Sequence, residues 1–237
     1  GMAAPLLILK TGSTYPEIAS GHGDFEDWFI RIIESCGAAY EVVDATVPFA
    51  ADLTRFSGAI LTGSLASAYW DEPWIGTIAD WIRRAVRSGK PILGVCFGHQ
   101  MLGRALGGTV RRCTNGLELG TVEIHLTGEG KSDPLFEGLP DTFQAQETHV
   151  DEVVTPPPGA HVLAKNSHSA IQAMACGEDV WGVQFHPEIT DEIMRSLIHD
   201  LNTKGKLRES DSLLSDIRPT PVAEGILKRF ISLATDS

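Results

Sequence analysis

Short apolar runs alternate with amphipathic stretches along the first half of the chain. Apolar runs of this kind are typical of strands buried on both faces of a parallel sheet. Between them, apolar residues recur at helical spacing, and glycines end these stretches. The alternation predicts an α/β fold, in which helices flank a wound, mostly parallel (mixed) sheet. The predicted strands are residues 5–9, 40–43, 59–61 and 91–95, and the predicted helices span residues 25–33, 74–86 and 97–106.

The pattern changes in the second half to short extended segments that glycines and prolines separate. From Thr109 to Val183 we expect mixed or antiparallel strands that extend the sheet. Thr190 then caps a helix with acidic residues in its first turn. We interpret Lys204 to Arg218 as a polar, charged connection, and we expect Thr220-Pro221 to open a final helix.

Length and charge limit the classes of protein to consider. The 237 residues suffice for one α/β domain, so we expect a single domain over 1–237 with a C-terminal extension at 204–237. Gly1 before Met2 is interpreted as the remnant of an expression tag. The formal net charge of −12 argues against nucleic acid or an anionic membrane as partner. Without a spanning apolar run or a secretory signal, the protein is expected to be cytoplasmic.

The cysteines are scattered and form no C-x-x-C pair, which fits a reduced compartment. Neither a metal site nor a cofactor is indicated. Cys96 differs from the others because it joins a predicted strand to a predicted helix, within Gly94-Val95-Cys96-Phe97-Gly98. This is the spacing of a nucleophile elbow, with sulfur in place of a hydroxyl. A helix N-terminus favours a thiolate, so we predict a nucleophile here rather than a small buried hydrophobe.

A thiol near its ordinary pKa needs a base, which is usually a histidine that a carboxylate orients. His186 follows a predicted strand at Val183–Phe185, so it lies at the same sheet edge as the elbow. Glu188 is two residues further, which in extended backbone places both side chains on one face. Pro187 biases His186 toward that extended geometry. We therefore predict that His186 is the base and that Glu188 orients it.

Two stretches, G-V-C-F-G-H-Q at 94–100 and G-V-Q-F-H-P-E at 182–188, resemble the signatures of class I glutamine amidotransferases. The resemblance covers nearly the whole chain and implies a flavodoxin-like architecture. It implies a Cys-His-Glu triad of Cys96, His186 and Glu188. It also implies attack on the side-chain amide of glutamine, a γ-glutamyl thioester, release of ammonia and hydrolysis to glutamate.

The same resemblance implies substrate contacts and an oxyanion hole. Gln100 matches a position that contacts bound glutamine in the family. One oxyanion N–H would belong to Phe97 and the other to a glycine-rich turn, which here reads Thr62-Gly63-Ser64-Leu65. Ser64 is thus the second predicted donor, and Gly63 is predicted to border the substrate. Because a serine replaces the second glycine, we expect a turn with fewer accessible backbone angles.

Further likenesses point to two groups within the family. The T-G-S turn resembles stand-alone members, including γ-glutamyl peptidases. His149, in T-H-V-D-E-V at 148–153, matches a stretch of the GMP synthetase group. Its role is open between a packed, hydrogen-bonded histidine and a functional one. His99, just inside the elbow helix, is expected to be structural.

Three functions follow from these observations. The first is a free-standing hydrolase of glutamine or of a γ-glutamyl compound, which acts through a thioester on Cys96. The second is a glutaminase subunit that supplies ammonia to a separate synthase, since no P-loop or second catalytic domain follows in the sequence. The third, a non-catalytic binding or regulatory protein, is disfavoured because a binder has no need of all three triad residues.

Overall fold

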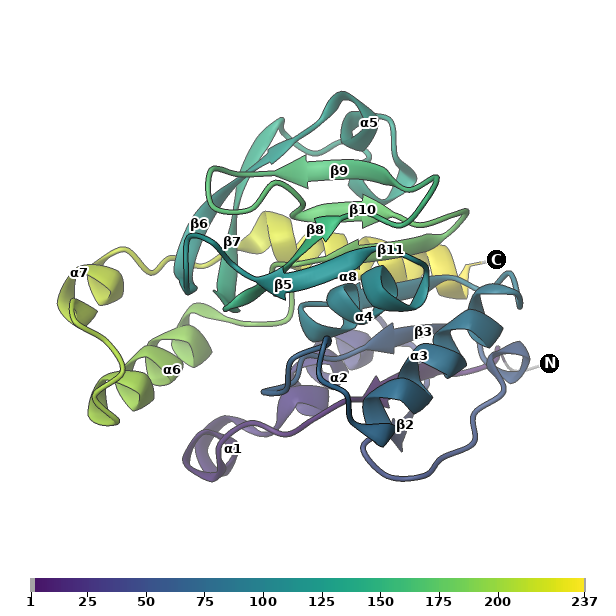
Figure 1. The fold of residues 1–237 in the computed structure, drawn as a ribbon, viewed down its shortest axis with the longest axis horizontal. Helices are drawn as coiled ribbons and strands as arrows, with labels where there is room; N and C mark the ends of the chain where they lie inside the picture. Colours follow the sequence, from purple (N-terminus) through teal and green to yellow (C-terminus); the bar gives the residue numbers. More distant parts are fainter. Residues whose placement is uncertain (1–2, 237) are drawn as a thin grey trace.

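The computed structural model describes residues 3–236, and within them a nine-stranded mixed sheet forms the centre of the molecule (Figure 1). In sheet order its strands are β2 (Tyr40–Asp44), β1 (Leu6–Lys10), β3 (Gly58–Leu61), β4 (Ile92–Val95), β11 (Val180–Val183), β10 (Ala173–Ala175), β9 (His161–Lys165), β6 (Glu118–Leu126) and β7 (Thr142–His149). A separate two-stranded sheet consists of β5 (Thr109–Arg112) and β8 (Asp151–Thr155).

The sheet has a parallel half and an antiparallel half. The strands β2, β1, β3, β4 and β11 are parallel, and β10, β9, β6 and β7 continue the sheet with antiparallel pairing. This confirms the predicted wound, mixed α/β sheet. Although β11 comes late in the chain, it pairs with β4, and Val183 lies opposite Val95. That register brings the stretch 182–188 beside the elbow at 94–98.

Helices cover both faces of the parallel half. Strand side chains alternate between the faces, so that Leu6 packs into one apolar cluster and Leu7 into the other, both fully buried. The strands are therefore buried on both faces, as their continuous apolar runs predict. The helices on the first face are α2 (Phe25–Ser35) and α8 (Pro221–Thr235), and those on the second are α3 (Pro73–Val86) and α4 (Phe97–Ala105).

A third apolar cluster lies where α1 (Pro16–His22), α6 (Asp191–Thr203) and α7 (Ser210–Ser215) meet, on the left in Figure 1. Neither α1 nor α7 follows from the sequence pattern. The prediction of a plain polar connection from Lys204 to Arg218 is wrong over α7, because its leucines pack against this cluster. The shorter helical turns are Leu53–Arg55, α5 (Gly128–Lys131) and Pro134–Phe136.

Strand β7 is also absent from the predictions, although its sequence carries a signal. Phe143 and Ala145 are buried and alternate with polar residues at period two. The strand pairs with β6 along its whole length and ends at His149. Its last residues reach the elbow, so this strand matters for the site.

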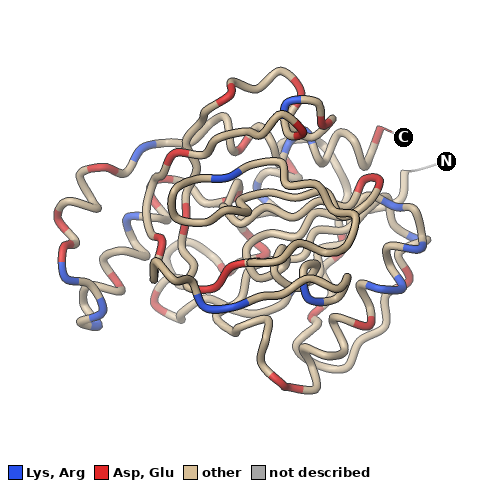
Figure 2. The backbone as a smooth tube through the Cα atoms, turned by 45° about the horizontal axis from the view of Figure 1, so that its top comes forward, with Lys and Arg blue, Asp and Glu red and all other residues tan. Residues whose placement is uncertain are grey.

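Several expectations concern the surface and the ends of the chain. Acidic and basic positions are interspersed along the described chain in Figure 2, so the net charge of −12 is spread over many elements. In the part of the chain that the structure describes, no helix has the length and apolar character needed to cross a bilayer. Gly1, interpreted as a tag remnant, lies outside the described residues.

Candidate active site

Cys96 occupies a sharp turn between β4 and α4. Its φ of 53° and ψ of −103° are unusual for a residue with a side chain. The turn leaves no room beside it, because a Cβ on Gly94 would come within 2.5 Å of the Gly98 carbonyl oxygen. A Cβ on Gly98 would come within 2.5 Å of the Leu61 carbonyl oxygen. Both flanking glycines are therefore required, and Cys96 sits at the N-terminus of α4 with 7% of its surface exposed.

His186 and Glu188 form a buried pair beside the elbow. His186 Nδ1 lies 2.7 Å from Glu188 Oε2, and the two residues are 4% and 1% exposed. β11 ends at Val183 rather than at the predicted Phe185, but backbone pairing fixes His186 nonetheless, because its N–H donates to the Gln146 carbonyl oxygen at 2.9 Å. A backbone hydrogen bond to β7 thus holds the loop that follows β11 in place.

Electrostatics favour a protonated imidazole at His186. Burial by itself would lower its pKa, but the charges of Glu188 and Cys96 oppose burial and raise the pKa of His186 well above its ordinary value. The carboxylate occupies Nδ1, which leaves Nε2 without a hydrogen-bond partner among the described residues. The free nitrogen thus belongs to a ring that the neighbouring negative charges keep protonated. A thiolate and an imidazolium can therefore coexist here.

The sulfur has two further neighbours that the sequence analysis did not name. Gln184 Nε2 lies 3.5 Å from Cys96 Sγ, and the Thr148 carbonyl oxygen lies 3.7 Å from it. Gln184 in turn accepts from Gln100 Nε2 at 3.2 Å, and Gln100 also donates to the Asp151 carbonyl oxygen at 2.9 Å. The sulfur thus contacts one amide donor and one carbonyl acceptor, which together fix its position.

The turn at 62–65 is held in one orientation by two buried threonines. Thr62 Oγ1 donates to the Gly63 carbonyl oxygen at 3.1 Å, whereas Thr11 Oγ1 is 2.8 Å from the Thr62 carbonyl oxygen and 3.0 Å from the Gly63 oxygen. β1, which precedes Thr11, and β4, which precedes Cys96, flank β3 on opposite sides. Because C=O and N–H point in opposite directions in a trans peptide, the Ser64 N–H points away from the Gly63 carbonyl oxygen that the Thr11 hydroxyl approaches.

This turn lies against the imidazole and is unstrained. A Cβ on Gly63 would lie 3.4 Å from His186 Cε1, so the turn borders the ring. Neither Gly63 nor Ser64 has a positive φ, so a serine fits this turn without strain. The N–H groups of Ser64 and Phe97 donate to no acceptor among residues 3–236. Both residues line a cavity that also borders Cys96.

Two cavities meet at Cys96. The polar chamber has a volume of about 290 Å³ and is lined by Ser67, Gln100, Asp151 and Lys206 among others. The apolar pocket has a volume of about 100 Å³, and its walls carry aromatic and aliphatic side chains next to His186. Cys96, Ser64 and Thr148 border both cavities, as do Tyr15, Leu65 and Leu201, so the polar chamber also has apolar walls. The apolar walls are Tyr15, Phe25, Trp28, Leu65, Ile189, Leu197 and Leu201.

Comparison with known proteins decides the family. The model of the family described as "Glutamine amidotransferase class-I" matches residues 22–201. The chain belongs to the class I glutamine amidotransferases. The resemblance of the two sequence motifs is thereby confirmed.

Relatives of this amidotransferase include proteins of two kinds. Gamma-glutamyl peptidase 5 of Arabidopsis thaliana is 29% identical over 87% of this chain and 83% of its own length. The glutamine-hydrolyzing GMP synthase subunit of Saccharolobus solfataricus is 33% identical over 70% of this chain and 85% of its own. A solved glutamine amidotransferase from Thermotoga maritima has the same fold, with a TM-score of 0.79 at 23% identity and 100% coverage of both chains.

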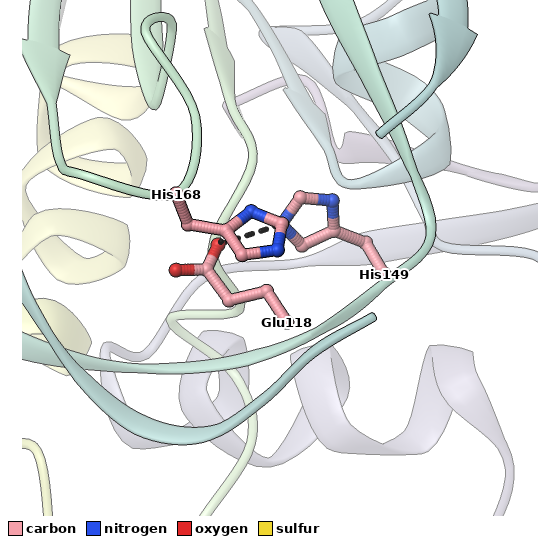
Figure 3. Close-up of side chains that lie close together, drawn as sticks. All are labelled: Glu118, His149 and His168. Atoms are coloured by element: carbon pink, nitrogen blue, oxygen red, sulfur yellow. Dashed lines mark hydrogen bonds and ion pairs between the residues drawn. The ribbon is translucent and has the colours of Figure 1, made fainter. Parts of the chain in front are cut away.

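A buried polar cluster lies behind the polar chamber of this amidotransferase (Figure 3). His149 Nδ1 is 2.7 Å from the Asp151 carbonyl oxygen, and His149 Nε2 is 2.7 Å from Glu118 Oε1. Asn166 and Gln172 also donate to the Glu118 carboxylate. Burial by itself would raise the pKa of Glu118, but hydrogen bonds with His149, Glu147 and Asn166 lower it to about 2. The role of His149, left open by the sequence, is therefore that of a buried, hydrogen-bonded residue.

The same cluster has the composition of a metal site, because His168 joins Glu118 and His149. The direct hydrogen bond between Glu118 and His149 occupies the space that an ion would need. Two ligands of one ion are further apart than the 2.7 Å that separates these atoms. We therefore interpret the cluster as a support for β6, β7 and the loop at 166–169.

The remaining sequence candidates are structural. His99 is fully buried against Gly182, and burial lowers its pKa to about 3, so it is neutral. Burial raises the pKa values of Cys113 and Cys176 to about 12, which makes both thiols poor nucleophiles at neutral pH. Cys36 is exposed. Cys96 is thus the cysteine that shares a pocket with the His186–Glu188 pair, whereas Cys113 Sγ lies 3.7 Å from His149 Nδ1.

Proposed function

We propose that this chain hydrolyses γ-glutamyl amides through a thioester on Cys96 and needs no partner subunit to do so. Its membership of the amidotransferase family and the convergence of Cys96, His186 and Glu188 at one sheet edge support the chemistry. The anchored Gly63–Ser64 peptide supports the independence from a partner. This anchored peptide is the observation that carries the proposal.

The residues divide the reaction between them. The Cys96 thiolate attacks the γ-carbonyl carbon, and the negative charge on the carbonyl oxygen is held by the N–H groups of Phe97 and Ser64. The imidazolium of His186 gives its proton to the amide nitrogen, the C–N bond breaks, and the amine leaves. Glu188 orients the ring and stabilises its charge.

The second half returns the enzyme to its starting state. His186, now neutral, takes a proton from a water molecule, whose oxygen attacks the thioester carbon. The C–S bond breaks, glutamate is released, and the Cys96 thiolate is restored. The sum is one amide and one water consumed, and one glutamate and one amine formed. No atom changes its oxidation state in either half of the reaction. His186 carries each proton that is transferred.

An ammonia-supplying subunit needs low hydrolysis until its acceptor arrives, and a mobile oxyanion turn would provide that control. Here two fully buried threonine hydroxyls hold the Gly63 carbonyl on the β1 side of β3. Flipping the peptide would break the hydrogen bond from Thr62 Oγ1 and turn the carbonyl away from the Thr11 hydroxyl, at a cost on the order of 0.5–1.5 kcal/mol. The hole is therefore formed at rest, as a hydrolase requires.

The alternative is a glutaminase subunit that delivers ammonia to a separate synthase. The similarity to the GMP synthase subunit of Saccharolobus solfataricus favours it. The similarity to the plant γ-glutamyl peptidase extends over a larger share of this chain and favours the independent hydrolase. The hydrogen bonds at the Gly63 carbonyl support the hydrolase.

Steady-state release of glutamate from glutamine and from γ-glutamyl dipeptides by the purified chain alone tests the proposal. We expect saturable turnover without any added protein. Absence of turnover on every compound, with activity restored by an added cellular protein fraction, would reject independence in favour of the ammonia-supplying role. Turnover that survives in the Cys96→Ser variant would reject the thioester route.

A further inference from the structure

We propose that the amine released by this enzyme is apolar and carries no further charge, as in the γ-glutamyl amide of an arylalkylamine. The inference rests on the proposed function and concerns the half of the substrate beyond the scissile bond. It follows from which cavity adjoins His186, what lines that cavity, and how large it is.

The chemistry assigns one cavity to each half of the substrate. The leaving nitrogen must face His186 to receive its proton, so the group attached to that nitrogen lies on the His186 side of the sulfur. His186 lines the apolar pocket, whereas Gln100 lines the polar chamber. The glutamyl half, with its α-amino and α-carboxylate groups, therefore occupies the polar chamber, and the amine occupies the apolar pocket.

The walls of the apolar pocket exclude a charged amine. No lysine, arginine or carboxylate side chain is among its lining residues in the described chain. Lys206 lines the polar chamber instead, and Lys204 is already paired with Glu17 and Asp200 at 2.9 and 2.8 Å. A second ammonium on the amine would lose its hydration without gaining an anionic partner, and a carboxylate would meet only the His186 imidazolium, which must give its proton to the leaving nitrogen. Amino acids, peptides and diamines are therefore poor leaving groups here.

The size of the pocket argues against ammonia. About 10–15 Å³ of such space suffices for one water-sized molecule. The pocket offers about 100 Å³, so ammonia would leave most of it empty. Three aromatic side chains (Tyr15, Phe25 and Trp28) contribute to its walls, and a flat apolar ring gains most from such surroundings.

A set of matched substrates measures this preference. γ-Glutamyl-phenethylamide and γ-glutamylphenylalanine differ only by a carboxylate, glutamine lacks the amine substituent, and γ-glutamyl-1,4-diaminobutane adds an ammonium. We expect kcat/KM for the phenethylamide to exceed each of the others by about tenfold or more, since binding of apolar groups discriminates at this scale. Equal or higher values for any of the other three would overturn the proposal.

A variant should change the preference in a known direction. Leu197→Arg places a cation in the wall of the apolar pocket, on the partly exposed side of α6. We expect it to lower kcat/KM for the phenethylamide and to raise it for γ-glutamylphenylalanine. The matched control is Val154→Arg, an exposed residue on β8 outside both cavities, which should leave the ratio unchanged. An unchanged ratio in Leu197→Arg would contradict the assignment.

Two further measurements keep the outcomes distinct. Should Leu197→Arg fail to fold, Phe25→Leu removes one aromatic wall and should lower the phenethylamide preference about tenfold or less. Calorimetric binding of the phenethylamide and of glutamine to the Cys96→Ser variant isolates recognition from chemistry. Preferential binding of the phenethylamide without turnover by the wild type would reject the proposed function and keep the pocket assignment. Turnover without preference would keep the function and reject the pocket assignment.

Discussion

Cys96 has a positive φ, which is unusual for a residue other than glycine. Its side chain has several polar neighbours. The positive φ directs Sγ out of the sheet edge, and the glycines at 94 and 98 are the condition for that turn. His186 needs a different kind of support, which is a buried carboxylate on one nitrogen and an open second nitrogen. The tight turn therefore fixes the position of Cys96, and the buried carboxylate of Glu188 fixes the orientation of His186.

Cys96→Ser should abolish amide hydrolysis and leave the fold intact, because a hydroxyl is similar in size but far less nucleophilic near neutral pH. Glutamate release and thermal unfolding measure the two effects. A diazo-ketone analogue of glutamine should label Cys96 in the wild type. Cys113→Ser is the matched control, since that thiol is buried and its pKa is raised to about 12. Labelling at Cys36, Cys113 or Cys176 instead of Cys96 would contradict the nucleophile assignment.

Glu188→Gln should lower turnover less than His186→Ala, which we expect to cost several orders of magnitude. The neutral amide still bonds the ring but no longer raises the pKa of His186. In the wild type the pKa of His186 is raised in the folded state above the ordinary value of 6.5. Protonation of His186 therefore stabilises the fold fully below pH 6.5, and this contribution is lost as pH rises through the pKa of the folded state.

The consequence is a stability difference with a defined sign. The free energy of unfolding of the wild type exceeds that of Glu188→Gln, and this difference should shrink as pH rises above 6.5. Between pH 6.5 and the raised pKa of folded His186 it should fall by about 1.4 kcal/mol per pH unit. Urea unfolding at several pH values measures it. Val154→Ala, at an exposed residue on β8 that carries no titratable group, is the control and should show no such trend. A difference that grows with pH would show that His186 is not the group whose pKa Glu188 raises.

At the scale of elements, the site forms where loops after four strands meet. β1 contributes Thr11, β3 contributes the turn at 62–65, β4 contributes Cys96, and β11 leads to His186. The antiparallel strand β7 adds Thr148 from the other half of the sheet. The carboxyl ends of parallel strands place these loops at one edge, which is where open α/β sheets bind their ligands.

The sequence motifs predict the triad and most parallel strands, because buried runs and flanking glycines are local signals. Contacts between strands are not local, so Thr11, Thr148 and Gln184 could not be assigned to the site. Thr11 had a signal in retrospect, since T-G-S occurs at 11–13 and again at 62–64. The two turns follow neighbouring strands and hydrogen-bond to each other, which only the sheet order reveals.

Thr11→Val tests the anchored turn. The isosteric change removes a hydroxyl that lies 2.8 Å from the Thr62 carbonyl oxygen and 3.0 Å from the Gly63 carbonyl oxygen, so the Ser64 N–H should spend less time aimed at the oxyanion. Because that donor acts in the transition state, kcat should fall while KM stays nearly constant. The loss should stay below the roughly 10²–10³-fold that follows removal of an oxyanion donor.

The control for this variant is Thr77→Val on the exposed side of α3, which should leave both constants unchanged. A purely structural role for Thr11 predicts a different outcome. In that case thermal stability falls, and kcat of the folded fraction stays at the wild-type value. Such a result would remove the support for an oxyanion hole that is formed at rest.

At the scale of the molecule, the hydrophobic core includes residues that lie beyond the end of the family match. The matched region ends at residue 201, yet α8 contributes six buried residues to the apolar cluster that also includes strands of the parallel half. Trp181 of β11 meets Phe230 of α8 edge-on, with ring centroids 6.0 Å apart. The predicted C-terminal extension therefore packs against the strand that leads to His186.

The prediction of one domain over 1–237 can be tested through that contact. Phe230 is fully buried, so Phe230→Ala should lower the free energy of unfolding by about 3–5 kcal/mol. If the chain is one cooperative unit, the whole transition shifts, and tryptophan fluorescence and far-ultraviolet circular dichroism stay coincident in urea. Lys228→Ala, at an exposed position on the same helix, should change stability by no more than about 0.5 kcal/mol. Two separate transitions, of which only a minor one responds to Phe230→Ala, would show that the C-terminal segment folds apart from the catalytic sheet.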